Sequence, residues 1–185
     1  MTSLVQAPGT PAVTESFTVN IDCDQKMNNP DKGSDPWDKC MCQQLCAKVK
    51  KMDSARKQGK MNPVPGARTL PAYKSGKKAY IDSFMKKVAE KRGVRSMFIH
   101  KCAADKYMNS VHPGNPTTGG TSAPFNADHM HEAALGGSLT KMSNFKMLDR
   151  RVNQSISFQK YEPDGKHAGK PIKAHPSCNC PNGPE

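Results

Sequence analysis

Apolar residues recur at helical spacing through the first half of the chain. One such series runs through residues 40–58 and stops at Gly59, and a second covers residues 77–92 and ends at Gly93. A third series extends to residue 108, with Ser96 in the position of a helix cap. The pattern therefore predicts three amphipathic helices. The intervening residues 61–73 are rich in proline and are expected to form a loop.

The pattern changes from helical spacing to short alternation after a second loop, residues 109–124, which is rich in Pro and Gly. Residues 125–130 and 145–148 read as two short strands, separated by the turn residues Gly136-Gly137. Asp149 is well placed to cap a final helix that runs to residue 158. The expected fold class is α+β: a helical region followed by a small strand–strand–helix unit.

This organisation predicts one compact domain overall with four segments. They are an irregular leader with one possible strand at 17–21 (1–36), a basic helical region (37–115), the strand–strand–helix unit (116–165) and a cysteine-containing tail (166–185).

Composition and charge narrow the choice of partner. The 185 residues carry a formal net charge of +12, with 28 Lys and Arg against 16 Asp and Glu. Such an excess favours an anionic partner, nucleic acid first, although a solvated basic face predicts the same residues. No stretch approaches the roughly 18 apolar residues of a membrane span, so membrane insertion is not expected. The first twenty residues lack the pattern of a standard secretory signal.

The seven cysteines leave three interpretations open. Cys40, Cys42 and Cys46 lie together, and Cys178 with Cys180 lies near the other end. They can hold a structural zinc ion, form disulfides that attach the termini to the body, or remain as buried thiols.

Candidate chemistry concentrates in the strand–strand–helix unit. Asp128 and His129 lie in the first strand, and Asn144 and Asn153 follow in the second half of the unit. If the helix packs across the hairpin, Asn153 can face Asp128, which places a carboxylate and an amide oxygen on a shared ion. Hard oxygen ligands of this kind favour Mg²⁺ or Mn²⁺, and zinc is less suited to them.

These residues resemble the HNH, or ββα-metal, nuclease motif. Asn144 follows His129 by fifteen positions and Asn153 follows Asn144 by nine, with Gly136-Gly137 between the strands. The resemblance covers about 35 of the 185 residues, and the paired Cys-x-x-Cys zinc knuckles of many members are not matched. It implies that His129 is the general base, that Asp128 and Asn153 hold the metal, and that Asn144 holds the loop and orients His129.

Neighbouring residues extend the candidate site. His131 and Glu132 are possible metal or substrate ligands, since His131 falls on the same strand face as His129. A surface histidine is the alternative interpretation of His131. Four basic residues near the motif are expected to bind DNA phosphates, unless they form an ordinary solvated helix face: Lys146, Arg150, Arg151 and Lys160.

The function implied is a metal-dependent, largely sequence-nonspecific DNA endonuclease. The organisation also resembles bacterial antagonistic nuclease toxins of the type VI secretion class, which implies a cognate immunity protein, a secretion-apparatus carrier, synthesis in the bacterial cytoplasm and delivery into a target cell. A phage or mobile-element endonuclease carries the same motif. Two further alternatives remain: a non-catalytic nucleic-acid-binding or adaptor module with a cysteine-rich structural site, and a metal-dependent ribonuclease.

Overall fold

The computed structural model describes residues 23–28, 35–61, 64–110, 115–117 and 124–157. The predicted strand at 17–21, Lys160, Cys178 and Cys180 lie outside this part. The helices are α1 (Cys23–Asn28), α2 (Lys39–Lys57), α3 (Pro71–Ala89), α4 (Lys101–Met108) and α5 (Arg150–Ser157), and the strands are β1 (Phe125–His129) and β2 (Phe145–Asp149). Short 3-10 turns lie at Ala67–Thr69, Arg95–Met97, Ala133–Leu135 and Met142–Asn144. None of the described helices has the length and apolar character that crossing a membrane requires.

The first predicted helix is confirmed as α2. Asp38 caps it, because its side chain accepts a hydrogen bond from the Met41 amide at 2.9 Å. After the helix ends, Gly59 adopts a positive φ of 66°, the conformation that favours glycine at this position. The apolar stripe is buried as its spacing predicts, at Cys42, Leu45, Val49 and Met52.

The next two helices differ from their predicted bounds. α3 begins at Pro71, inside the expected loop, because proline is well suited to the first turn of a helix, where its missing N–H costs nothing. Ser96 does not cap a helix; its hydroxyl donates to the Gly93 carbonyl at 2.7 Å. Phe98 instead forms a bridge with Met147 of β2, and α4 starts only after His100. Pairing with a distant strand thus shortened the predicted helix.

The strand–strand–helix unit is present. β1 and β2 pair antiparallel, with Phe125 opposite Asp149 and His129 opposite Phe145. Asp149 caps α5 as predicted, since its Oδ1 accepts from the Arg151 amide at 2.8 Å. The mixed α+β class is therefore confirmed.

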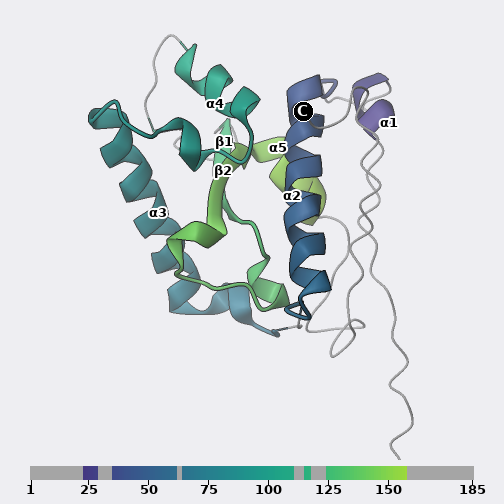
Figure 1. The fold of residues 1–185 in the computed structure, drawn as a ribbon, viewed down its shortest axis with the longest axis vertical. Coiled ribbons are helices and arrows are strands. Elements are labelled where there is room, and N and C mark those ends of the chain that lie inside the picture. The colour runs from purple at the N-terminus through teal and green to yellow at the C-terminus, as the bar shows by residue number, and fades with distance from the viewer. Residues whose placement is uncertain (1–22, 29–34, 62–63, 111–114, 118–123, 158–185) are drawn as a thin grey trace, which may run out of the picture.

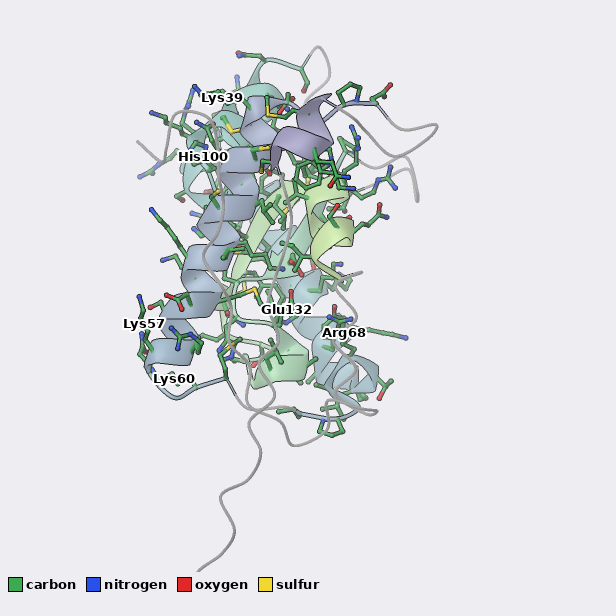
Figure 2. All side chains as sticks on the ribbon, turned by 90° about the vertical axis from the view of Figure 1, so that its right-hand side faces the viewer. Lys39, Lys57, Lys60, Arg68, His100 and Glu132 are labelled. Carbon is green, nitrogen blue, oxygen red and sulfur yellow. A yellow bond between two sulfur atoms is a disulfide. The ribbon has the colours of Figure 1, made fainter. Side chains whose placement is uncertain are left out.

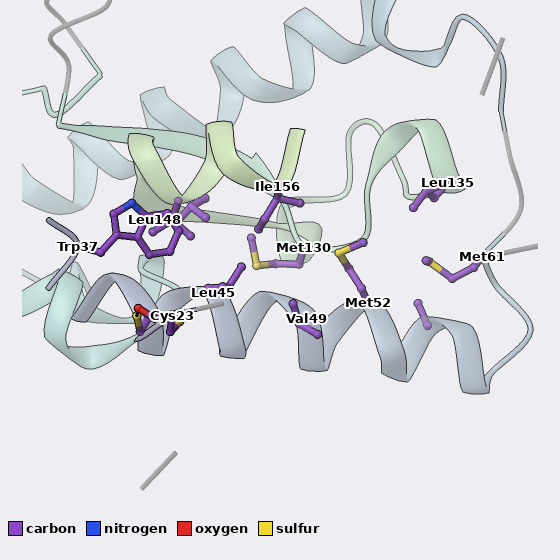
Figure 3. Close-up of a cluster of buried hydrophobic side chains, with 13 residues drawn as sticks. Cys23, Trp37, Leu45, Val49, Met52, Met61, Met130, Leu135, Leu148 and Ile156 are labelled. Carbon is purple, nitrogen blue, oxygen red and sulfur yellow. Dashed lines mark hydrogen bonds between the residues drawn. The ribbon is translucent and has the colours of Figure 1, made fainter. Parts of the chain in front are cut away.

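The hairpin lies between α2 and α3 (Figure 1) and is buried on both faces. One core cluster joins Met130 and Leu148 to α2 and α5, and Figure 3 shows Leu45, Val49 and Met52 of α2 in this layer. The second cluster joins the alternate hairpin residues to α3 and α4: Phe125, Ala127, Phe145 and Met147. Successive residues of β1 therefore project toward different helices.

A disulfide connects Cys40 of α2 to Cys102 of α4, with 5.7 Å between their Cα atoms. This bond joins two helices of the body, whereas the interpretation from the sequence was of disulfides that attach the termini; Cys178 and Cys180 lie outside the described residues. Cys40 is accordingly lost as a zinc ligand. Cys23, Cys42 and Cys46 are buried.

Candidate functional site

Asn144 ties down the loop that joins the two strands. Its Oδ1 accepts from the His131 amide at 2.9 Å, and its Nδ2 donates to the carbonyls of His131 and Ser138, both at 3.0 Å. The loop returns so closely that a Cβ on Gly137 would lie 1.8 Å from the His131 oxygen. Glycine is therefore required there by contact with the backbone.

A buried ion-pair network lies on the α2 side of the hairpin. The Nζ of Lys48 contacts Asp128 Oδ2 and lies 2.5 Å from Glu132 Oε1, and its side chain is 0% exposed. On the other side of Glu132, Arg68 Nη2 lies 3.4 Å from Oε2 (Figure 2). Two carboxylates and two cations thus meet at one end of the hairpin, and their formal charges balance.

Burial and charge compete in setting the pKa values of this network. Burial alone would lower the pKa of Lys48, but the charges of Asp128 and Glu132 outweigh burial and raise it. Burial raises the pKa of Asp128 despite the attraction of Lys48. For Glu132, the cations Lys48 and Arg68 overcome burial and lower the pKa. The ammonium of Lys48 is accordingly held in its charged form by its two partners.

His129 lies on the α3 side and is 1% exposed. Its ring stacks on Tyr73 of α3, with 5.0 Å between the ring centroids. It also packs against Phe145 of β2, with 4.2 Å between the ring centroids. Burial, assisted by the positive charges of Lys48 and Lys77, lowers the pKa of His129 to about 4, although Glu132 and a hydrogen bond to the Leu139 backbone oppose the shift. The imidazole is therefore neutral near pH 7. Its Nε2 is buried and has no hydrogen-bond partner among the described residues.

The other predicted metal or substrate ligands have varied surroundings. His131 is half-buried, and its Nε2 lies 2.8 Å from the Leu135 carbonyl within the loop. Asn153 is half-buried in α5, which packs against both strands as the predicted arrangement requires. A shared ion between Asn153 and Asp128 stays a prediction.

The predicted phosphate-binding residues also take part in contacts within the fold. Lys146 donates to the Ser96 carbonyl, and Arg150 Nη1 lies 3.5 Å from Gln154 Oε1. Arg151 donates to the backbone carbonyls of residues 35 and 36, which attaches that segment to α5. Burial and the nearby charge of Lys51 lower the pKa of Lys146. DNA binding by these side chains remains a prediction.

Three residues of the site were not predicted from the sequence: Lys48, Arg68 and Tyr73. A signal existed for Lys48, because it falls between Leu45 and Val49 on the apolar face of its helix, where a lysine is unusual. Arg68 and Tyr73 fall in the segment expected to be a loop, and no periodic pattern marks them.

The carboxylate oxygens of Asp128 and Glu132 are of the chemical type that a hard divalent cation prefers. Mg²⁺ is commonly held by one or two carboxylates, with waters in its other positions, and Asp128 and Glu132 direct one oxygen each to a single cationic nitrogen. Among the described residues, no group of three or more His, Cys, Asp or Glu side chains is arranged to hold a metal ion. Comparison of the chain with family models, with curated proteins and with solved structures found no match.

Proposed function

We propose that this protein is a metal-dependent, largely sequence-nonspecific DNA endonuclease. The observation that carries the proposal is the state of His129, a neutral buried imidazole whose Nε2 has no partner among the described residues. It lies at the end of β1, next to Asp128, in a hairpin followed by a helix. This combination agrees with the HNH resemblance of the sequence.

In the proposed reaction, His129 Nε2 accepts a proton from the water that attacks the phosphodiester. Asp128 and Asn153, with Glu132 as a further oxygen donor, would hold Mg²⁺ or Mn²⁺. When bound, the metal ion supplies positive charge that stabilises the phosphate and the departing oxygen. Asn144 contributes indirectly, by holding the loop that follows β1.

Access to His129 requires movement of surrounding side chains. The ring is 1% exposed, and Tyr73 stacks on it. Water and a phosphate therefore reach Nε2 only if side chains around the ring move aside. The proposed enzyme is closed in this structure and opens when it binds DNA.

The biological role follows by extension of the same proposal. We infer an antibacterial effector that is made in the bacterial cytoplasm, carried by a secretion apparatus and neutralised in the producer by an immunity protein. The net charge of +12 supports binding to the DNA backbone without reading of the bases.

A specific observation favours a second candidate, a non-catalytic nucleic-acid-binding module. Lys48 already contacts both Asp128 and Glu132, and His129 is enclosed by aromatic rings. In this alternative the network only stabilises the fold. Such a module binds DNA in a salt-sensitive manner and leaves it intact.

Incubation with supercoiled plasmid and with single-stranded RNA tests the proposal. Wild type is compared with His129→Ala and with His129→Phe, which keeps an aromatic ring between Tyr73 and Phe145, and circular dichroism verifies that each variant is folded. Nicking of plasmid by wild type in Mg²⁺ or Mn²⁺, lost on chelation and in both folded variants, is the expected result. Plasmid binding without cleavage moves the conclusion to the binding module, and cleavage of RNA alone identifies a ribonuclease.

A further inference from the structure

Lys48 is the most deeply buried charged residue of the site. Its side chain is 0% exposed although it belongs to α2, where most other lysines reach solvent. It lies on the apolar face between Leu45 and Met52, and its Nζ ends between Asp128 and Glu132. Complete burial of a lysine is rare unless its charge is paired, so its place here is set by the two carboxylates.

The two carboxylates need a cation as much as Lys48 needs an anion. Asp128 is 6% exposed and Glu132 is 9% exposed, so both are largely removed from water. Two negative charges left together in such a place repel each other, and neither is well hydrated. Arg68 contacts only the outer oxygen of Glu132, at 3.4 Å. The position between the inner oxygens therefore requires positive charge.

A second feature lies close by, on the α3 side of the hairpin. The Nε2 of His129 is a buried polar atom without a partner in the described part of the chain. His129 lies close enough to Glu132 and Lys48 to respond to the charge of each. A buried nitrogen with no partner among the described residues thus lies within electrostatic range of the cation position.

We propose that the Lys48 ammonium occupies the position at which Asp128 and Glu132 would hold a divalent cation, so that the cation binds only by displacing it. The inference rests on the proposed function for the choice of Mg²⁺ or Mn²⁺ as the ion. Lys48 thereby acts as an internal competitor that lowers metal affinity. In the metal-bound protein the four-carbon stem withdraws and the ammonium moves away from the two carboxylates.

Titration of Mn²⁺ followed by electron paramagnetic resonance tests this competition on the full chain. Lys48→Met keeps the length and apolar stem of the side chain and removes its charge. The matched control is Lys51→Met, because Lys51 lies in the same helix but is exposed. We expect Lys48→Met to bind Mn²⁺ roughly tenfold more tightly or better than wild type and the control, since a like charge within contact distance strongly opposes a cation at a buried site.

Two results overturn the proposal. One is a folded Lys48→Met protein that binds Mn²⁺ no more tightly than Lys51→Met. The other is an equal gain in a triple variant that combines Lys48→Met with Asp128→Asn and Glu132→Gln, because the ion would then bind elsewhere. If Lys48→Met is unfolded without metal, we expect saturating Mn²⁺ to restore its circular dichroism spectrum, and failure to do so also overturns the proposal.

The metal titration needs no DNA, so its outcome is separate from that of the plasmid assay. Tight Mn²⁺ binding by Lys48→Met, with no cleavage by either wild type or Lys48→Met, supports the displaced ammonium and refutes the nuclease. Cleavage by wild type without a gain in Lys48→Met supports the nuclease and refutes the displacement.

Discussion

At the scale of single residues, His129 links burial to pH. Its pKa is lowered to about 4, from an ordinary value of 6.5, chiefly by burial. In the unfolded chain the ring takes up a proton as the pH falls below about 6.5, whereas the folded protein does not until about pH 4. Proton uptake by the unfolded state therefore lowers the free energy of unfolding across this window, by up to about 3 kcal/mol.

We therefore expect wild type to lose stability from pH 6.5 to 4 more steeply than His129→Phe. Urea denaturation at several pH values measures the difference, and comparison of the two proteins removes the contribution of carboxylates that titrate in both. Equal slopes for wild type and the variant would show that His129 is not the group responsible.

The hydrogen bonds of Asn144 are expected to contribute measurably to the free energy of unfolding. Its side chain accepts one hydrogen bond and donates two, all to the backbone of residues 131 and 138. Asn144→Asp keeps the shape but sets a carboxylate against two carbonyl oxygens, so we expect a loss of roughly 1–3 kcal/mol in the free energy of unfolding. Asn109→Asp, at an exposed position after α4, is the matched control. Faster hydrogen exchange at the backbone amides of the loop that the Asn144 amide group holds is the local signature, and unchanged exchange in Asn144→Asp contradicts the assignment.

At the scale of elements, α3 contacts the interstrand loop closely at Gly76. A Cβ at this position would lie 1.9 Å from the Leu139 carbonyl oxygen. Gly→Ala inside a helix ordinarily stabilises by about 1 kcal/mol. At Gly76 the close contact with the loop outweighs this gain. We expect Gly76→Ala to lower the free energy of unfolding by roughly 1–3 kcal/mol, because the added methyl group pushes α3 away from the loop.

Thermal unfolding of Gly76→Ala beside Ser75→Ala, at the adjacent exposed position, measures this effect. Because Tyr73 lies on the same helix, displacement of α3 is also expected to expose His129, which increases its rate of modification by diethyl pyrocarbonate. A Gly76→Ala protein as stable as Ser75→Ala is the contrary result.

The elements also show how far sequence reasoning extends. The buried stripe of α2, both strands and the Asp149 cap follow from local spacing, and all are present. The predicted starts of α3 and of the third helix were wrong, because a proline in the first turn set the start of α3 and the pairing of Phe98 with a distant strand delayed the start of α4. The motif residues could be named in advance, but Lys48 contacts Asp128 across 80 positions of sequence. No local pattern specifies that pairing.

At the scale of the whole molecule, the Cys40–Cys102 disulfide closes a loop of 62 residues that contains all of α3. Restriction of the unfolded chain by such a loop is worth about 4 kcal/mol in the chain-entropy model. We therefore expect reduction with dithiothreitol to lower the midpoint of thermal unfolding of wild type. We expect a Cys40→Ala/Cys102→Ala protein to have a lower midpoint of thermal unfolding than oxidised wild type and to show no change in that midpoint when the reductant is added. A response of equal size in that variant would assign the effect to other cysteines.

The two-faced burial of the hairpin has a consequence for how relatives of this chain are to be sought. Asp128 meets α2 through Lys48, while its neighbour His129 meets α3 through Tyr73. The sheet separates the α2 side from the α3 side, and side chains along β1 alternate between these two sides. Deletion of one residue within β1 would keep both side chains yet exchange their compartments. Relatives are therefore expected to keep an even sequence separation between the residues that match Phe125 and His129, whereas the lengths of their loops can differ.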